Sequence, residues 1–475
     1  MTSAVLDEAA SAATNKATLE AAFTTAGAGG TVTISATGTY LVSDVLMPAD
    51  RVLDCNASRL LSPVLASGSG KPILWALGAD CRITNGTFDG QRDNQPDDGF
   101  SDSVDGGGHQ PGEDPRGRAY RCAIRADVSS GQDGQEAPHN LTVDNCTFIR
   151  MYGAGVVCRG GNDTTITDNL ALSTNFELAH VSQSDGTGVT TITGNRLWLV
   201  GSGHSSVNAD GFVIGQTPLL FQNNKATSVE RCLIKVSSPG ATITGNRVNG
   251  NNVRWRGDNP GSLVGSYAGI QLENVQDSTV ADNFFADVGS GVYVSNTSAD
   301  NIDIERNVVM GTNGTTTPDG VLVQAGASSI RVRNNTVTDS TRYGVHVTGE
   351  VTGLVVSGNR LRGKASASGA GIWIVSAGGD FAGPVVTDNN VAEFSGLGGA
   401  GLVALYSSGG GTFSDVAVSG NTIDATGAFA ERGIFWHQST DYIAGVVSRN
   451  TVTGVLSIAS NAWLEKINNT VEAVA

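Results

Sequence analysis

One asparagine recurs along most of this chain, at the corner between two short hydrophobic segments. Residues 191–215 show a full copy of the repeating unit, with segments rich in β-branched residues. Neighbouring asparagines are between 19 residues apart (Asn450 to Asn469) and 37 residues apart (Asn246 to Asn283). The corner asparagines are Asn169, Asn195, Asn224, Asn246, Asn283, Asn307, Asn335, Asn359, Asn389, Asn421, Asn450 and Asn469. A fixed corner with connections of variable length indicates the stacked turns of a parallel solenoid.

Each unit holds strands too short to bury a face alone, so neighbouring coils must stack at about 4.8 Å, the spacing between paired strands. Two earlier copies, at residues 83–88 and 143–148, place the asparagine one position early and bring the count to fourteen. This arrangement resembles the right-handed parallel β-helix of the pectate-lyase and polygalacturonase superfamily, which phage tailspikes also use. The resemblance implies an all-β fold, a single-stranded right-handed parallel β-helix of about 14 coils or more.

The repeat predicts one long domain, although a chain of 475 residues would ordinarily divide into roughly two or three. Residues 5–27 are rich in alanine and leucine and end at glycines, which predicts an α-helix. This helix should cover the open hydrophobic end of the solenoid, so residues 1–28 are predicted to form an N-terminal cap. The β-helix is predicted over residues 29–475, with loop insertions at residues 91–138 and 249–268.

The charge balance restricts the partners of the protein. A net charge of −16 and a pI of about 4.7 argue against nucleic acid and anionic membranes, since both bind clustered Lys and Arg. No run of about 18 apolar residues occurs that would span a bilayer. No signal peptide is visible after Met1, so we expect a secreted or virion-associated protein, either as a mature chain or exported by another route. Both a monomer and a homotrimer fit these observations.

The cysteines and the first insertion leave two chemical alternatives open. The six cysteines lie mostly in strand patterns without metal-binding spacing, which fits either buried thiols or one or more disulfides. Four carboxylates in the insertion either bind a calcium ion through oxygen ligands or face solvent: Asp97, Asp98, Asp102 and Asp105. No other metal or cofactor is expected.

A second hydrophobic segment in each coil follows a glycine, as in residues 211–215. Residues 178–182 and 231–235 are aligned with this segment by their alternating hydrophobic residues. The alignment places an acid directly before the segment on three consecutive coils: Glu177, Asp210 and Glu230. Stacked carboxyls about 5 Å apart raise one another's pKa, so one should hold a proton and donate it to a glycosidic oxygen. The alternative is that these acids only begin strands, as Asp319 does before Gly320.

The residues around Asp210 carry a narrower resemblance. The motif N-A-D-G at residues 208–211 is similar to the N-T-D-G motif of polygalacturonase-like hydrolases, and E-R-C at residues 230–232 stands where that family has D-D-C. The resemblance implies that Asp210 is the base-side carboxylate and Glu230 the general acid of a glycoside hydrolase. Arg231 replaces the second aspartate of the family motif, and the G-H-G motif of the next coil is missing.

Two other functions remain open. A polysaccharide lyase needs a base and a cation that stabilises an enolate, and four basic residues of the same predicted wall fit these roles or salt bridges to the acids: Arg159, His180, Arg231 and Lys235. A non-catalytic carbohydrate-binding spike or adhesin needs neither role. The residues predicted to bind a polysaccharide or oligosaccharide substrate are Arg231, Lys235, His180, His204, Arg159, Trp255 and Glu273.

Several of these side chains have a structural alternative. Trp255 lies between two arginines in the second insertion, where it either stacks on a sugar or packs its loop onto the wall. His346 and His437 are expected to be surface residues. A further outward column is predicted to extend the groove, to cover a loop or to meet another subunit: Gln271, Tyr293, Leu322, His346, Trp373, Val403 and Phe435.

Overall fold

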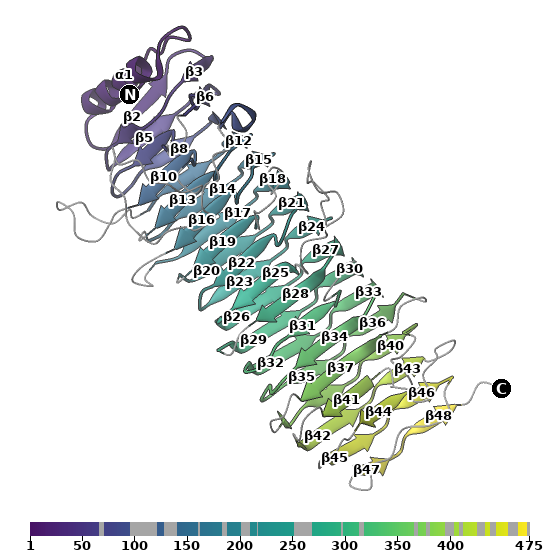
Figure 1. Ribbon diagram of the computed structural model, residues 1–475. Coiled ribbons are helices and arrows are strands. Elements are labelled where there is room, and N and C mark those ends of the chain that lie inside the picture. Colours follow the sequence, from purple (N-terminus) through teal and green to yellow (C-terminus); the bar gives the residue numbers. More distant parts are fainter. Residues whose placement is uncertain are drawn as a thin grey trace. The chain divides into compact units, whose positions relative to one another are not determined.

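The computed structural model describes two compact units, each a right-handed parallel β-helix built from three parallel sheets (Figure 1). Unit 1 lies within Met1–Lys235, and unit 2 within Val236–Asn252 and Leu263–Ala475. The structure describes residues 1–65, 71–95, 121–127, 140–159, 162–182, 188–200, 210–215, 217–250, 268–295, 298–312, 318–364, 369–376, 381–394, 403–407, 412–424, 433–437, 443–454 and 464–472. The predicted all-β fold is therefore confirmed.

Unit 1 winds through three sheets, here called A, B and C. Its sheet A strands are β1 (Thr2–Ala4), β2 (Gly30–Ile34), β5 (Arg51–Asp54), β8 (Arg82–Thr84), β11 (Thr142–Asp144), β14 (Thr165–Thr167), β17 (Thr190–Thr193) and β20 (Leu219–Gln222). Its sheet B strands are β3 (Thr39–Leu41), β6 (Arg59–Leu61), β9 (Thr87–Asp89), β12 (Thr147–Ile149), β15 (Leu170–Leu172), β18 (Arg196–Val200) and β21 (Lys225–Val229). Its sheet C strands are β4 (Val45–Met47), β7 (Leu74–Ala76), β10 (Ile124–Asp127), β13 (Val156–Arg159), β16 (Ala179–Ser182), β19 (Phe212–Gly215) and β22 (Ile234–Ser237), which ends in unit 2.

Unit 2 repeats this arrangement. Its sheet A strands are β23 (Ala241–Thr244), β26 (Gln276–Ala281), β29 (Asp300–Glu305), β32 (Ser328–Arg333), β35 (Val355–Ser357), β38 (Phe381–Ala382), β39 (Val385–Thr387), β42 (Phe413–Ser419), β45 (Ile443–Ser448) and β47 (Leu464–Ile467). Its sheet B strands are β24 (Arg247–Asn249), β27 (Phe284–Val288), β30 (Val308–Thr312), β33 (Thr336–Ser340), β36 (Arg360–Gly363), β40 (Asn390–Ala392), β43 (Thr422–Asp424), β46 (Thr451–Thr453) and β48 (Thr470–Glu472). Its sheet C strands are β25 (Ala268–Glu273), β28 (Ser290–Ser295), β31 (Val321–Val323), β34 (Tyr343–Thr348), β37 (Ala370–Ser376), β41 (Val403–Ser407) and β44 (Ile434–His437).

The corner asparagines form a hydrogen-bonded ladder within each unit, as the sequence predicts. The backbone N–H and the Nδ2 of Asn359 both donate to Oδ1 of Asn389, at 3.0 and 2.9 Å, and the same Nδ2 donates to the carbonyl of Val332. The residue before the asparagine has a left-handed backbone, with φ of 56° at Asp388. This conformation favours Gly, Asn and Asp, and it turns the chain so that the buried amide faces the next coil.

The two early, irregular copies differ from the later ones by one position. Asn85 and Asn145 occupy the left-handed position, with φ of 58° and 51°. Cys146 takes the place of the ladder asparagine, and its N–H donates to Oδ1 of Asn169 at 2.9 Å. All six cysteines belong to the described residues, all are buried, and none is joined to another by a disulfide, which favours the buried-thiol alternative. Burial raises the pKa of the Cys146 thiol to about 12.

The N-terminal helix α1 (Ala12–Ala26) packs against β1, β2 and β4 at the start of unit 1 (Figure 1). The prediction placed its start at residue 5, which is wrong. The hydroxyl of Ser11 accepts from the N–H of Thr14 and caps the helix there, while residues 2–4 pair with β2 as a strand. Leu19 and Phe23 are buried on the inner side of α1. No helix among the described residues is long and apolar enough to cross a membrane.

The first predicted insertion is interrupted by regular structure. Residues 124–127 lie inside the range 91–138 and form strand β10, which pairs in parallel with β7 and β13. A short 3₁₀-helix, η1 (Arg92–Asn94), begins the same range. The prediction of one unbroken loop is therefore wrong, because a four-residue strand between polar stretches is too short for the repeat pattern to reveal.

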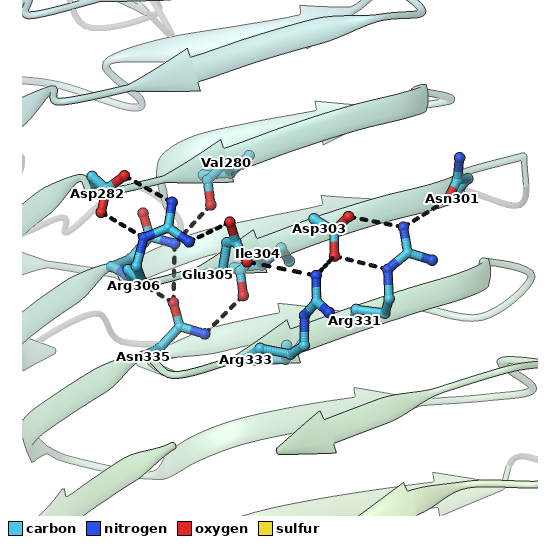
Figure 2. Close-up of polar contacts among 12 residues, drawn as sticks. Val280, Asp282, Asn301, Asp303, Ile304, Glu305, Arg306, Arg331, Arg333 and Asn335 are labelled. Atoms are coloured by element: carbon cyan, nitrogen blue, oxygen red, sulfur yellow. Dashed lines mark hydrogen bonds and ion pairs between the residues drawn. The ribbon is translucent and has the colours of Figure 1, made fainter. Parts of the chain in front are cut away.

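Charged side chains of opposite sign alternate on the outer face of sheet A in unit 2 (Figure 2). Arg331 donates to both carboxylate oxygens of Asp303, at 2.7 and 2.9 Å, and to the side chain of Asn301 at 2.6 Å. Nη2 of Arg333 lies 2.5 Å from the same Asp303. Hydrogen bonding from Arg331 chiefly lowers the pKa of Asp303. Cross-strand pairing thus replaces the repulsion that stacked like charges would cause.

Candidate functional site

Asp210 lies in unit 1, two residues before strand β19 of sheet C and directly before Gly211. A Cβ atom on Gly211 would lie 2.5 Å from the carbonyl oxygen of Leu233, so only glycine lets this coil approach the next one. The N–H of Gly211 donates to Cys232, and Oδ1 of Asp210 accepts from the N–H of Cys232 at 3.2 Å. The local sequence therefore holds a carboxyl group against the backbone of the following coil.

The Asp210 carboxyl is nearly buried, with 3% of the residue exposed. Burial is the main cause that raises its pKa to about 6, and the charge of Glu177 adds to the increase. Arg231 and Lys235 act in the opposite direction, and Nη1 of Arg231 lies 3.8 Å from Oδ2 of Asp210. A carboxyl with this pKa holds a proton at mildly acidic pH and releases it near neutrality, as a general acid must.

Glu177 supplies a second carboxylate to the same place. It lies one coil before Asp210, is also buried, and approaches His180, whose Nδ1 is 3.1 Å from Oε1 of Glu177. His180 lies opposite Val157 and Val213 on the outer face of sheet C. The structure therefore brings five predicted site residues together: Glu177, His180, Asp210, Arg231 and Lys235.

The predicted position of Glu230 is wrong by two residues. The alignment set Glu230 beside Asp210, whereas the N–H of Phe212 donates to Leu233 and the Asp210 carboxylate meets Cys232. Glu230 therefore comes two residues before the position that lies opposite Asp210. The N–H of Glu230 donates to the carbonyl of Val200 in β18. Glu230 therefore directly follows β21 of sheet B and does not begin the sheet C strand β22.

The remaining predicted site residues lie elsewhere. Arg159 ends β13 opposite Ser182, two residues beyond the His180 position. Glu273 belongs to unit 2, where its Oε1 accepts from Nε2 of Gln271 at 2.9 Å. Predictions that lie outside the described residues concern His204, Trp255, Asp97, Asp98, Asp102 and Asp105. No group of three or more potential metal ligands among His, Cys, Asp and Glu occurs in the described part of the chain.

In unit 2, Asp319 and His346 belong to a second buried cluster that was not predicted from the sequence. His346 was expected at the surface, but only 8% of it is exposed and it contacts Asp319, which is fully buried. The predicted outward column also needs a correction, because Trp373 lies opposite Ala404 and not Val403, which is buried in the core. An aspartate before a glycine, followed one coil later by an arginine and a basic residue four positions on, would have revealed this cluster.

Comparison with protein families identifies the fold family. The family described as "Right handed beta helix region" matches residues 130–309, 183–361 and 319–474, which together span more than half of the chain. The chain belongs to this right-handed β-helix family. No curated protein matches the sequence.

Solved structures of other β-helix proteins are similar to this chain in fold. The surface adhesin PfbA of Streptococcus pneumoniae matches with a TM-score of 0.51 and 14% identity over 83% of this chain and 91% of the adhesin. Gene product 12 of bacteriophage phi29, in its pre-mature form, matches with a TM-score of 0.51 and 13% identity over 98% of this chain and 71% of the phage protein. The alginate lyase AlyF-OU02 matches with a TM-score of 0.49 and 13% identity over 87% of this chain and 88% of the lyase.

Proposed function

We propose that this β-helix protein is a glycoside hydrolase that cleaves a polysaccharide at the Glu177–Asp210 cluster. The observation that carries the proposal is the pairing of two buried carboxyls on neighbouring coils, one of which has a pKa of about 6. Cleavage of a glycosidic bond needs one carboxyl that donates a proton and a second that acts as base or nucleophile. A polymeric substrate also places the working protein outside a cell or on a virion.

In this mechanism Asp210 donates its proton to the glycosidic oxygen, since its raised pKa keeps it protonated at mildly acidic pH. Glu177 acts on the opposite side of the bond as base or nucleophile, directly or through a water molecule, and His180 orients its carboxyl group at 3.1 Å. Donation of this proton leaves Asp210 charged, and Arg231 stabilises the charge until the carboxyl takes up a proton again from the attacking water or from solvent. This assignment reverses the roles that the family resemblance implies for Asp210.

The other predicted residues serve the substrate. Lys235 lies in the strand that follows Arg231 and directs an ammonium group to the same cluster, where it lowers the pKa of Asp210. Arg159, at the end of β13, and Glu230, directly after β21, belong to the same unit, and we assign both to substrate binding. His204 and Trp255 lie outside the described residues and stay in the proposal as substrate-binding residues.

Elimination is the second candidate, and it is favoured by the three cationic or basic side chains at the same place: His180, Arg231 and Lys235. A lyase would use a neutral basic group to remove the C5 proton of a uronate and the cations to stabilise the enolate. The two neighbouring carboxyls of Glu177 and Asp210 match the pair of groups that hydrolysis uses, and for this reason we rank hydrolysis first.

Incubation with a panel of neutral and uronate polysaccharides tests the proposal. New reducing ends without ultraviolet-absorbing unsaturated uronates indicate hydrolysis, and both signals together indicate elimination. Asp210→Asn and Glu177→Gln should each abolish the release of reducing ends. Asp168→Asn is the matched control, because Asp168 is an exposed carboxylate of the same unit at a left-handed corner where Asn is equally suited. Binding of a polysaccharide without cleavage would support the non-catalytic spike and reject the enzyme.

A further inference from the structure

Unit 2 contains a second polar cluster in sheet C, built on Asp319, Arg342 and His346. Asp319 is fully buried. Arg342 donates two hydrogen bonds to its carboxylate, from Nε to Oδ1 at 2.9 Å and from Nη2 to Oδ2 at 2.8 Å. Nδ1 of His346 lies 2.9 Å from Oδ2 of Asp319. The same Nδ1 lies 2.8 Å from Nη2 of Arg342, so it either donates to Asp319 or accepts from Arg342, and with either tautomer a hydrogen bond ties the histidine to the Asp319–Arg342 ion pair.

This cluster occupies the same repeat positions as the cluster of unit 1. Asp319 precedes Gly320 as Asp210 precedes Gly211, and a Cβ atom on either glycine would lie 2.4 to 2.5 Å from a carbonyl oxygen of the next coil. On that next coil, Arg342 and His346 are four residues apart, as Arg231 and Lys235 are in unit 1.

The registers of the two clusters agree as well. Val321, two residues after Asp319, pairs with Val345, three residues after Arg342. In unit 1 the N–H of Phe212, two residues after Asp210, donates to Leu233 and so places Phe212 beside Ile234, three residues after Arg231. The two clusters are therefore equivalent positions of one structural repeat.

The arginine–aspartate ion pair has a different geometry in the two clusters, and this geometry indicates whether the second cluster fits catalysis or ligand binding. Nη1 of Arg231 lies 3.8 Å from Oδ2 of Asp210, whereas Arg342 donates two hydrogen bonds shorter than 3 Å to Asp319. Both carboxylate oxygens of Asp319 are engaged by Arg342 and the side chain is fully buried, so Asp319 is poorly placed to reach a glycosidic oxygen. The second cluster therefore fits ligand binding better than acid catalysis.

A row of aromatic rings lies beside the cluster. Tyr343 contacts His346 with ring centroids 4.6 Å apart and stacks on Trp373 at 5.6 Å, and Trp373 stacks on Tyr406 at 5.7 Å. The guanidinium of Arg342 lies over the ring of Tyr343, 4.8 Å from its centroid. Because the rings face one another, their edges rather than their faces meet the surface, and stacking fixes the direction of each edge.

Those edges carry hydrogen-bonding atoms that the protein leaves unused. Among the described residues, no hydrogen-bond partner is present for the hydroxyl of Tyr343, for Nε2 of His346 or for the indole N–H of Trp373. Tyr343 and His346 are each only 8% exposed, so packing fixes the orientation of their rings. None of the three is among the buried side-chain atoms without a partner in the described part of the chain, so each can be reached by a ligand that supplies a hydrogen bond.

We propose that this edge, formed by Tyr343, His346 and Trp373 and held by Asp319 and Arg342, is a binding site for a neutral saccharide chain. Hydroxyl groups of a sugar both donate and accept hydrogen bonds, and they match the mixed donors and acceptors of the three rings. The charges of Asp319 and Arg342 cancel, so the site holds no free cation for a uronate carboxylate. The inference does not depend on cleavage at Asp210, since it stands on unit 2 alone.

Isothermal titration with maltohexaose, cellohexaose and laminarihexaose, and with hexagalacturonate as the charged probe, tests the site. At least one neutral hexasaccharide should bind. Tyr343→Phe and Trp373→Phe keep the stacked rings but remove one polar atom each, so each should weaken binding by about 3- to 10-fold. Tyr40→Phe in unit 1 removes a hydroxyl elsewhere and should leave the Kd unchanged. Asp210→Asn should also leave it unchanged even where cleavage is lost, which separates this site from the proposed catalytic one.

Three results would overturn the proposal. The first is that none of the three neutral hexasaccharides binds, and the second is that both ring substitutions leave the Kd unaltered. The third is that analytical ultracentrifugation shows self-association that Trp373→Phe abolishes, because a second copy of the chain would then cover the edge. Binding of hexagalacturonate as tightly as the neutral chains would likewise contradict the charge argument.

Discussion

The asparagine ladder offers a matched pair of substitutions at neighbouring positions of one chain segment. Asn389 is 1% exposed and belongs to the ladder, whereas Asn390 is exposed at the start of β40 and has no side-chain hydrogen bond among the described residues. Replacing each with alanine removes the same amide group. Any difference between Asn389→Ala and Asn390→Ala therefore reports the ladder itself, and not helix or strand propensity.

The magnitude follows from the groups that Asn389→Ala leaves without a partner. The backbone N–H and the Nδ2 of Asn359 both lose their acceptor, and the carbonyl of Val356 loses a donor at 2.9 Å. A buried donor without a partner costs about 1 to 3 kcal/mol, so the two donors on Asn359 imply a loss of about 2 to 6 kcal/mol. An exposed substitution such as Asn390→Ala should change the free energy of unfolding by about 0.5 kcal/mol or less.

Urea unfolding followed by far-ultraviolet circular dichroism measures both variants against the parent. The prediction is a clear fall in the midpoint for Asn389→Ala and an unchanged midpoint for Asn390→Ala, with the same urea dependence in each. Equal midpoints for the two variants would refute the reasoning, because the ladder would then contribute nothing beyond what water supplies to an exposed amide.

Two further predictions concern one buried and one half-buried carboxylate. The folded-state pKa of Asp210 is raised from 3.8 to about 6, so the parent loses about 3 kcal/mol of stability between those pH values, and Asp210→Asn should lack this loss in a pH series of urea titrations. A parallel pH dependence in the variant and the parent would contradict the assignment. Asp303→Asn leaves the charges of Arg331 and Arg333 side by side without a carboxylate between them, so it should lower the free energy of unfolding by about 1 kcal/mol at low salt. High salt should diminish this loss, and the exposed control Glu350→Gln should not show it. Because the pKa of Asp303 is lowered, its contribution should disappear as the pH falls through that folded-state value.

The fold could be predicted from the sequence because the corner asparagine marks each coil from Asn169 onward. An Asn such as Asn307 has one buried position that satisfies its donors and acceptor, so its spacing reports the coil length directly. The start of α1 was harder to predict, because alanine continues the helical pattern upstream of the Ser11 cap. Strand β10 escaped prediction since it stands between two polar stretches.

The site was only partly predictable, and the reason is the two-residue period of a strand. Sliding residues 231–235 by two positions keeps Cys232 and Ile234 in the core, so hydrophobic alternation cannot distinguish the two registers. The backbone bond from Phe212 to Leu233 decides between them and removes Glu230 from the position opposite Asp210. Asp210 could be predicted because the close approach of two coils requires a glycine at position 211, and this glycine is visible in the sequence directly after the aspartate.

The most direct test of the account is the pH profile of polysaccharide cleavage by the parent, by Asp210→Asn and by the control Asp168→Asn. If Asp210 is the general acid, kcat/KM of the parent falls above a pH of about 6. Asp210→Asn should lose about 100-fold or more of kcat, and Asp168→Asn should match the parent. Cleavage by Asp210→Asn at the parental rate, with the same alkaline limb, would contradict the central claim.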